Sequence, residues 1–419
     1  MKPLRWLRLP VLLTMLLMPA MLAPGAGRLA AAEGAQGGPR TVVARISVRD
    51  QGHLAAVAGE LDIWMARPEQ GYVIAAISEA QRAWLEDLGY GIRVLEAPTA
   101  GLETAAALDP RYHYFDDHVV NAQGRYVVDF LEGVEAAHPM ITELMDIGDG
   151  WMAGQPGQPH RDLWLMRVTN EDPALGPIDE KPTFFLSAAM HAREVASAEL
   201  AIRYLKHVTT GYDGAGGYGK DPDVTWLVDH HVCYVLVMHN PDGHVENEQN
   251  TGVNRRKNMD WDDGCSLWYD WGVDLNRNHS FLWGCCGGSS VNPCDITYRG
   301  PAAASEPETQ AFESTVTALM GDQNGPNGDN EIVPASTLTT TGILISLHTF
   351  GDLVLWPWGF DGYGDPPNEP ELRTIGRKFA FYNGYDASGG IGYPVDGAAD
   401  DWAYGKLGIP AYTFEVGPY

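Results

Sequence analysis

The sequence predicts an α/β protein with a mixed, largely parallel sheet flanked by helices, preceded by a small ferredoxin-like α+β module. From residue 112 onward, apolar strand-like segments alternate with helical ones, which is typical of a sheet covered on both faces. Between residues 41 and 97, shorter segments follow the order β-α-β-β-α-β of a split ferredoxin-like arrangement. The apolar fraction of 45% and charged fraction of 20% indicate a folded globular chain.

The small module is predicted from short apolar runs bounded by turn residues. Its strands are expected at 42–48, 63–66, 72–77 and 92–96, and its helices at 53–61 and 79–88. The following stretch, 97–110, contains Pro98, Gly101 and three consecutive alanines. This composition predicts an exposed linker that is open to proteolysis.

The large domain is predicted from Val-, Leu- and Ile-rich runs separated by helical patterns. Its strands are expected at 163–168, 183–189, 232–238, 342–348 and 411–416, and its helices at 123–137, 195–209, 305–320 and 369–382. In open sheets, functional groups collect at the carboxyl ends of the strands. His191, His348 and Glu415 all fall at such ends.

The first 32 residues predict a secretory signal peptide. Lys2, Arg5 and Arg8 form a basic start, residues 9–22 form an apolar core, and Ala30-Ala31-Ala32 offers a cleavage site. A membrane anchor is the alternative, but the apolar core is short and interrupted by prolines. We therefore expect a secreted protein, extracellular or periplasmic, that leaves the membrane when the signal is cleaved.

The net charge argues against some partners. The formal charge is −27, and loss of the four cationic residues in the first 32 gives −27 − 4 = −31. So acidic a chain disfavours binding to nucleic acids and to anionic membranes.

The cysteines agree with an oxidising compartment. Cys265, Cys285, Cys286 and Cys294 cluster within 30 residues and predict one or two disulfides. A structural zinc site is the alternative, but paired C-x-x-C spacing is lacking. Cys233 lies in an apolar run and is expected to be a buried free thiol.

Two histidines and a glutamate predict a metal site. His191 and Glu194 are three residues apart at the start of a helical pattern, so both side chains can point to one spot. His348 ends a later apolar run. Two histidines and one glutamate leave zinc an open position for water, and the separate carboxylate of Glu415 can take that water's proton. Each residue alone has a structural explanation, but the ordered set predicts a hydrolase.

Three further clusters fit hydrolysis at a chain end. Arg256 follows an Asn-Pro-Asp-Gly segment, and a guanidinium near a metal can stabilise an oxyanion. Asn276 and Arg277 place an amide beside a guanidinium, a pair suited to gripping a carboxylate. Tyr393 lies in a Gly-rich loop, where its phenol can close over a substrate.

In these residues the chain resembles the secreted zinc metallocarboxypeptidases of the carboxypeptidase A/B type, including the bacterial carboxypeptidase T-like members. The resemblance covers residues 112–419 and rests on motifs that occur in order. They are His-x-x-Glu, Asn-Pro-Asp-Gly, the Arg-Lys-Asn cluster, Asp-Leu-Asn-Arg-Asn, Tyr-Arg-Gly, Ser-Glu-Pro-Glu-Thr, the His348 strand and Thr-Phe-Glu.

The resemblance implies an enzyme that removes the last residue from peptides and proteins with one zinc ion per chain. His191, Glu194 and His348 would bind the zinc, and Glu415 would act as general base and acid. Arg256 would polarise the scissile carbonyl.

The resemblance also implies how the substrate is held. Asn276 and Arg277 would bind the terminal carboxylate, Tyr393 would cap the site, and Arg193 would border the next subsite. Cys265 and Cys294 would form the family's disulfide.

The family's domain organisation predicts three parts. They are a signal peptide at 1–32, an activation propeptide with its linker at 33–110, and a catalytic domain at 111–419. The propeptide would cover the active site until an activating protease removes it. Because the family extends a few dozen residues beyond its catalytic glutamate, the resemblance implies that this chain is truncated and lacks the C-terminal helix.

Two questions stay open at this stage. Asp400 matches the position where basic-specific members carry Asp, but Asp400 or Asp401 can instead cap a helix starting at Trp402. The same ligand set also serves relatives that hydrolyse peptidoglycan peptides or N-acyl amino acids. A further alternative to a carboxypeptidase is a non-catalytic peptide-binding relative.

Overall fold

The computed structural model describes residues 41–95, 125–214, 220–249, 254–324, 337, 339–360 and 364–418. The predicted signal peptide and the whole predicted linker lie outside these residues, so both stay predictions. Among the described residues, no helix has the length and apolar character needed to cross a bilayer.

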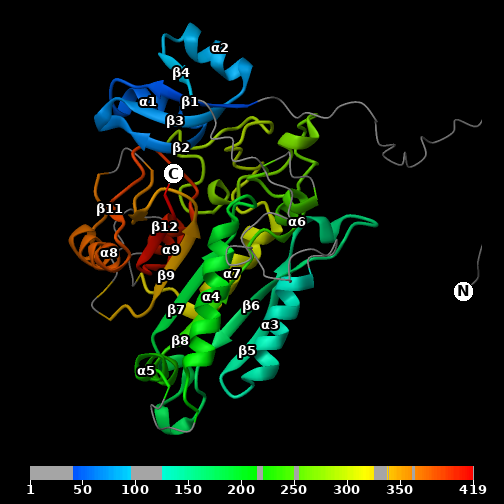
Figure 1. Ribbon diagram of the computed structural model, residues 1–419, viewed down its shortest axis with the longest axis vertical. Helices are drawn as coiled ribbons and strands as arrows, with labels where there is room; N and C mark the ends of the chain where they lie inside the picture. The colour runs from blue at the N-terminus through cyan, green and yellow to red at the C-terminus, as the bar shows by residue number, and fades with distance from the viewer. Residues whose placement is uncertain are drawn as a thin grey trace, which may run out of the picture. The chain divides into compact units, whose positions relative to one another are not determined.

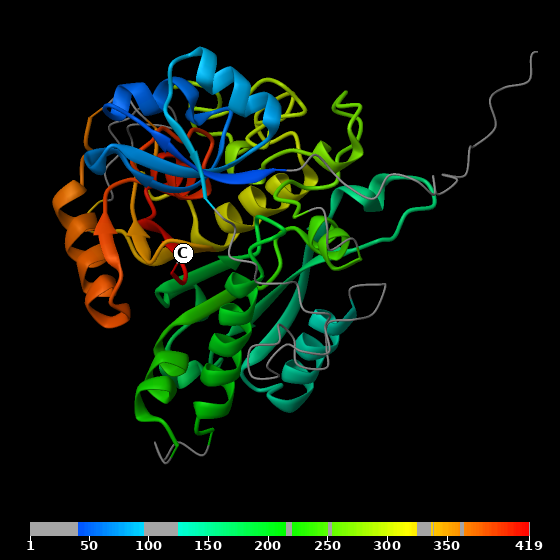
Figure 2. The same cartoon turned by 45° about the horizontal axis from the view of Figure 1, so that its top comes forward.

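The N-terminal module has the predicted order of elements. They are β1 (Val42–Ser47), α1 (Gln51–Ala58), β2 (Asp62–Arg67), β3 (Tyr72–Ile77), α2 (Glu79–Asp87) and β4 (Ile92–Val94). The four strands form an antiparallel sheet in the order β2-β3-β1-β4. Figure 2 shows the two helices lying over these strands. The split ferredoxin-like prediction is confirmed.

The core of this module follows from strand periodicity. Alternate residues such as Ile46 in β1 and Val73 in β3 face the same side of the sheet, where they pack with Leu54 of α1 and Leu85 of α2. A capping box at Ser78 begins α2, since the Ser78 hydroxyl and the Gln81 side chain bind each other's backbone N–H groups.

The large domain contains an eight-stranded sheet in the order β11-β10-β12-β9-β7-β8-β6-β5 (Figure 1). Its strands are β5 (Thr142–Asp149), β6 (Asp162–Val168), β7 (Thr183–Ala188), β8 (Val232–Leu236), β9 (Ile343–His348), β10 (Leu353–Leu355), β11 (Asp386–Ser388) and β12 (Ala411–Glu415). The central strands β12, β9, β7 and β8 are parallel, whereas the β5–β6, β6–β8 and β10–β12 pairs are antiparallel. A mixed, largely parallel sheet is what the sequence predicted.

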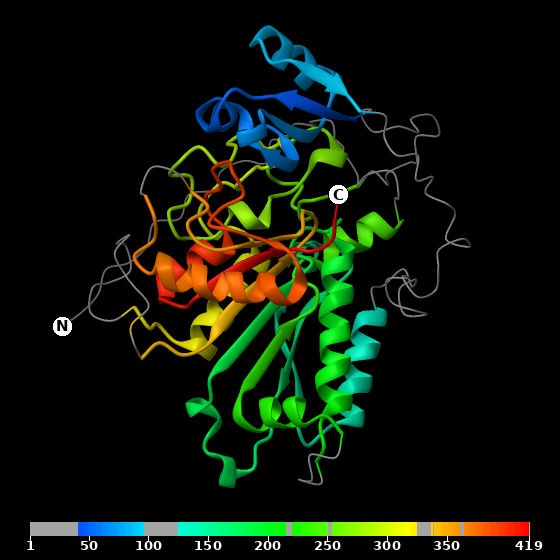
Figure 3. The same cartoon turned by 60° about the vertical axis from the view of Figure 1, so that its left-hand side comes forward.

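The helices of this domain are α3 (Arg125–Ala137), α4 (Val195–Gly211), α5 (Pro222–His230), α6 (Pro241–Gln249), α7 (Pro307–Met320), α8 (Glu369–Asn383) and α9 (Ala399–Leu407). Helices α3, α4, α7, α8 and α9 contact the sheet, and α5 packs against α4 (Figure 3). Helix α4 contacts β7, β8 and β9, whereas α9 contacts β9 and β12. The buried side of α4 follows helical spacing through Ala198, Ala201, Ile202, Leu205 and Val208.

The sequence missed elements that lack a clear hydrophobic period. The strands β10 and β11 have three residues each, and β5 is an edge strand with the polar sequence TELMDIGD. Helix α9 begins at Ala399 rather than Trp402, and its buried side chains include Asp400 and Asp401. These elements exist because the surrounding sheet supplies their partners, which a local pattern does not reveal.

Two disulfides join the cysteine-rich segment. Cys265 bonds to Cys294 with an S–S distance of 2.06 Å, and the neighbours Cys285 and Cys286 bond to each other. Cys233 is a buried free thiol in β8. All five cysteines thus have the states that the sequence predicted.

A buried polar network supports the loops beside the sheet. The Asn258 side-chain amide donates to Glu306 over 2.8 Å and to Glu308 over 3.2 Å, and its oxygen accepts from the Val273 N–H. Burial raises the pKa of Glu306 to about 7. Glu306 and Glu308 therefore join the start of α7 to the loops that carry Asn258 and Val273. Because these carboxyl groups are buried, ionising them is costly.

This network predicts a pH dependence of stability. The folded pKa of Glu306 lies above its ordinary value of 4.5, so its stabilising contribution is present below that pH and is lost as pH rises toward 7. The variant Glu306→Gln has no proton to lose. Between pH 5 and 8, wild type should lose on the order of 1–3 kcal/mol more unfolding free energy than the variant in urea titrations.

Glu79→Gln is the control, because this carboxylate is 83% exposed. Its pH dependence should match that of wild type. Equal pH dependence of wild type and Glu306→Gln would show that Glu306 ionises freely in the fold.

Candidate active site

The candidate active site lies at the carboxyl edge of the central strands. His348 and Glu415 are the last residues of β9 and β12 and face each other in the register of this parallel pair. Strand β7 ends at Ala188, three residues before His191. Because parallel strands end at the same sheet edge, residues far apart in sequence meet there.

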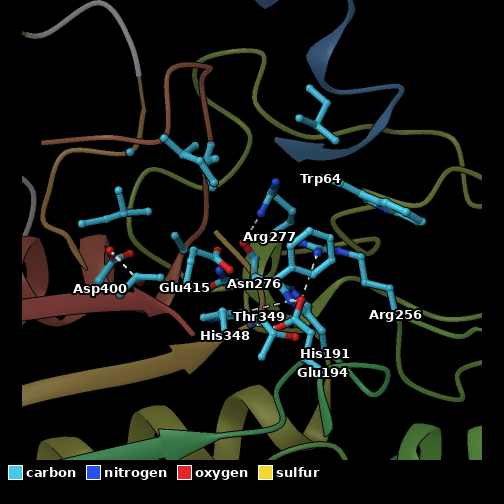
Figure 4. Close-up of a pocket in the computed structure, with 18 of the residues that line it drawn as sticks. Trp64, His191, Glu194, Arg256, Asn276, Arg277, His348, Thr349, Asp400 and Glu415 are labelled. Carbon is cyan, nitrogen blue, oxygen red and sulfur yellow. Dashed lines mark hydrogen bonds and ion pairs between the residues drawn. The ribbon is translucent and has the colours of Figure 1, made fainter. Parts of the chain in front are cut away.

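His191, Glu194 and His348 converge on one point (Figure 4). The Nδ1 atoms of the two histidines are 3.0 Å apart. One oxygen of Glu194 lies 2.6 Å from the His191 Nδ1, and the other lies 2.9 Å from the His348 Nδ1. All three residues are buried. The pair His191 and Glu194 occupies a turn that precedes α4, and Glu194 is the N-cap residue of that helix.

The remaining imidazole nitrogens have partners that fix the rings. The His191 Nε2 lies 3.1 Å from a carboxylate oxygen of Asp274, and the His348 Nε2 lies 3.0 Å from the Ser346 hydroxyl. Such outer contacts select the tautomer that leaves Nδ1 free to bind a metal.

This arrangement fits a zinc ion. Two ligand atoms at ~2.0–2.1 Å from a tetrahedral zinc lie about 3.3 Å apart, close to the observed separation of the two nitrogens. Two imidazoles and one carboxylate are also the donor set of catalytic zinc sites with an open position. The residues can therefore hold the metal that the sequence predicts.

Glu415 is partly buried beside these ligands and lines the same pocket. Burial raises its pKa to about 7, and the nearby His348 opposes that shift. A carboxylate whose pKa lies near 7 is suited to accept a proton at neutral pH.

Only part of the Arg-Lys-Asn cluster reaches the pocket. Arg256 lines the pocket, and its Nε donates to Asp274 over 2.9 Å. Arg255 instead donates to the carbonyls of Trp268 and Trp271, while Lys257 donates to those of Pro293 and Asp295. Arg255 and Lys257 thus stabilise loops through these hydrogen bonds. Of the three cations in the cluster, Arg256 is the one that lines the pocket.

Asn276 and Arg277 are adjacent in the pocket wall (Figure 4). The Asn276 side-chain oxygen Oδ1 accepts from the Ala399 N–H at the start of α9, over 3.0 Å. The Arg277 Nε donates to the Gly288 carbonyl and its Nη1 to the Asn276 carbonyl. Among the described residues, the Asn276 Nδ2 and the Arg277 Nη2 have no hydrogen-bond acceptor, so both remain for a ligand.

Asp400 contributes a carboxylate to another part of the pocket. It accepts from the Thr413 hydroxyl and from the Asp401 N–H, each over 3.0 Å. No cationic side chain pairs with it among the described residues. Burial raises the pKa of Asp400. Because α9 begins at Ala399 and its N-cap residue is Ala398, neither Asp400 nor Asp401 is the helix cap.

The N-terminal module contributes to the pocket as well. Ile63 and Trp64 line it, and both oxygens of Asp62 accept from the guanidinium of Arg193, one of them over 2.6 Å. Burial disfavours the charge on Asp62, but the charge and hydrogen bonds of Arg193 outweigh it and lower the pKa of Asp62. Tyr393 lines the pocket and packs against the apolar cluster of the module.

The sequence did not single out several residues that shape this site. Asp274 contacts His191 and Arg256, and its pKa is held well below the ordinary value because both arginines, Arg256 and Arg277, outweigh the cost of burial. An acidic residue two positions before the Asn-Arg pair was the available signal. Ser346 and Asp62 gave none, since their roles depend on contacts between distant segments.

The fold and the site define a zinc-hydrolase scaffold, and comparison with known proteins agrees. Residues 127–419 match the zinc carboxypeptidase family, and the chain belongs to it. Among solved structures, carboxypeptidase A from Helicoverpa armigera superimposes with a TM-score of 0.67 at 18% identity, covering 90% of this chain and 89% of that one. This likeness confirms the fold.

Two curated relatives show the extent of the sequence similarity. A zinc carboxypeptidase from Saccharothrix mutabilis subsp. capreolus is 26% identical over 375 residues, which are 84% of this chain and 76% of that protein. Bovine carboxypeptidase B is 29% identical over 293 residues, which are 68% of this chain and 60% of that protein. The chain thus spans less than two thirds of the bovine enzyme's length.

The contact between Asp274 and His191 predicts an effect on metal binding. Asp274→Asn should weaken zinc binding by about 10- to 100-fold, because an amide neither holds the His191 tautomer nor raises its basicity as a carboxylate does. Competition with a chromophoric chelator measures this affinity.

Asp400→Asn is the matched control, since Asp400 lines the same pocket without a hydrogen bond to either histidine. Its zinc affinity should equal that of wild type. Equal zinc affinity in Asp274→Asn and wild type would remove the ligand-orienting role.

Proposed function

We propose that this protein is a zinc-dependent metallocarboxypeptidase that hydrolyses the C-terminal peptide bond of peptides and proteins. The observation that carries the proposal is one pocket that combines the ligand set His191, Glu194 and His348 with the Asn276-Arg277 pair. A ligand set next to a carboxylate grip suits cleavage at a chain end. When bound, zinc lowers the pKa of a water molecule and polarises a carbonyl.

In this mechanism Glu415 removes the proton of the attacking water and delivers it to the leaving amine. Its partial burial and its raised pKa fit both directions of transfer. Arg256 lies across the pocket with its guanidinium fixed by Asp274. A preorganised cation there stabilises the oxyanion of the tetrahedral intermediate.

Substrate binding is assigned to the remaining pocket residues. Arg277 and Asn276 bind the terminal carboxylate through the nitrogens that have no acceptor among the described residues. Tyr393 closes over the bound residue, and Arg193 borders the adjacent subsite once Asp62 has left it. These roles would select peptides with a free C-terminus.

The preference is proposed to be for terminal Lys or Arg. Asp400 is a buried carboxylate with two neutral hydrogen-bond donors and, among the described residues, no cationic partner. Burial raises the pKa of Asp400, and the hydrogen bonds from Thr413 and Asp401 only oppose that shift. A substrate ammonium or guanidinium would supply the missing charge.

We further propose secretion and activation by proteolysis. The chain would lose residues 1–32 on export, and a protease would cut within residues 33–110 to release the N-terminal module from the catalytic domain, 111–419. The contact of Asp62 with Arg193 and the position of Trp64 in the pocket support a blocked site before cleavage.

The first test of this mechanism is Glu415→Gln. It should lower kcat by about 10²–10⁴-fold because the amide cannot accept the proton, while bound zinc stays at one per chain. Peptide hydrolysis is measured on the secreted protein before and after limited trypsin digestion, with and without a zinc chelator. Near-normal turnover of the variant would refute the role of Glu415.

The same assay tests the rival activities. Release of residues from peptidoglycan peptides or N-acyl amino acids, but not from ordinary peptides, would change the substrate class. Stoichiometric zinc with no turnover on any of these substrates would favour a peptide-binding protein.

The specificity proposal predicts a switch of preference in Asp400→Leu. Loss of the carboxylate should lower kcat/KM for terminal Lys and Arg by on the order of a hundredfold and raise it for Leu and Phe. Peptides that differ only in the last residue are compared. Asp401→Asn is the control, because Asp401 is buried beside Asp400 but binds the Gly359 N–H and should leave the preference unchanged.

A further inference from the structure

We infer that Asp396 is a positioning residue for Arg277, which it fixes through the loop that carries the Cys285–Cys286 disulfide. The inference rests on the proposed function, in which Arg277 binds the substrate carboxylate. Asp396 does not line the pocket and has no exposed surface. Its effect on a substrate therefore has to pass through other residues.

The side chain of Asp396 binds three groups of this loop. One carboxyl oxygen accepts from the Gly288 N–H over 2.9 Å and from the Cys286 N–H over 3.2 Å. The other oxygen accepts from the Ser289 hydroxyl. The loop lies more than a hundred residues earlier in the chain, so this one side chain determines where the loop stands against the segment after Tyr393.

Gly288 transmits the contact to Arg277. Its N–H donates to Asp396, and its carbonyl accepts from the Arg277 Nε over 2.8 Å. A Cβ at position 288 would lie 2.6 Å from the Val395 Cα and 2.7 Å from the Asp396 nitrogen. The glycine thus permits the close approach of the two backbones, and the carboxyl of Asp396 holds them there.

A second contact places the same segment directly on Arg277. Gly397 has a φ of +70°, and a Cβ there would lie 2.3 Å from the carbonyl oxygen of Arg277. The Gly397 carbonyl accepts from the His279 N–H over 3.0 Å. Gly397 therefore contacts the backbone of Arg277 directly. Asp396 contacts the guanidinium of Arg277 indirectly, through Gly288.

This geometry decides which nitrogens of Arg277 face the pocket. With Nε bound to Gly288 and Nη1 bound to Asn276, the guanidinium plane is fixed and Nη2 is presented to a ligand. A guanidinium grips a carboxylate only in a defined orientation. Displacement of the Gly288 carbonyl would release Nε and let the plane rotate.

The test compares two zinc-binding inhibitors on the zinc-loaded full chain, as secreted and after limited trypsin digestion. One is a mercaptopropanoate, and the other is its primary amide, which lacks the carboxylate. Asp396→Ala should weaken the carboxylate inhibitor by about 10- to 100-fold and leave the amide inhibitor unchanged. For peptides, KM should rise by a similar factor while kcat changes little.

Conservative variants keep the test decisive if Asp396→Ala folds poorly. Asp396→Asn can still accept from both N–H groups and donate to Ser289, so it should retain most of the inhibitor selectivity. Ser289→Ala removes one of the three contacts and should cause a smaller loss than Asp396→Ala. Asp221→Ala is the control, because it also removes an acceptor for two backbone N–H groups, at the start of α5.

A double-mutant cycle with Arg277→Gln separates this inference from the proposed function. If Asp396 acts through Arg277, adding Asp396→Ala to Arg277→Gln should weaken the carboxylate inhibitor no further. Additive losses, or equal weakening of both inhibitors by Asp396→Ala, would overturn the inference. If Arg277→Gln itself left the carboxylate inhibitor unaffected, the proposed grip of Arg277 would be wrong, whatever Asp396 does.

Discussion

The buried carboxylate of Asp274 is the contact on which the candidate active site depends. Its two oxygens join His191, 3.1 Å away, to Arg256, 2.9 Å away, and Arg277 lies within 3.9 Å. One side chain thereby binds a candidate metal ligand and Arg256, and its charge faces Arg277 as well. Because Asp274 lies beneath the pocket rather than in its lining, it can hold these groups without competing for a substrate.

Charge balance explains why so many ionisable groups remain buried together. Isolated charges are costly to remove from water, and pairing recovers that cost only when the geometry is good. Asp274 compensates the arginines, and Glu194 has two imidazoles against it. Glu415 and Asp400 are less well compensated, and burial raises the pKa of each. These two pocket-lining carboxyl groups are those to which we assign a proton and a cationic substrate side chain.

The N-terminal module also supplies a charge that compensates a cation of the pocket. Arg193 is partly buried and paired with the Asp62 carboxylate, and Trp64 lines the same pocket. The guanidinium of Arg193 binds a carboxylate of the chain itself, that of Asp62. Among the described residues, the Nη2 of Arg277 has no acceptor and could bind a carboxylate of a ligand. In the proposed activation, release of the module would remove Asp62 from Arg193 and Trp64 from the pocket.

The sequence by itself determined the fold class, the order of the strands and helices that it predicted in both parts, the cysteine states and the candidate site residues, all of which line the pocket. These features depend on local periodicity and on motifs whose spacing is visible along the chain. Only the tertiary structure decided how His191, His348 and Glu415 meet, that Arg255 and Lys257 bind loop carbonyls, and that Asp274, Ser346 and Asp396 orient their neighbours. The physical reason is that hydrogen bonds between segments a hundred residues apart leave no period in the sequence. They exist only once parallel strands have brought their ends to one edge of the sheet.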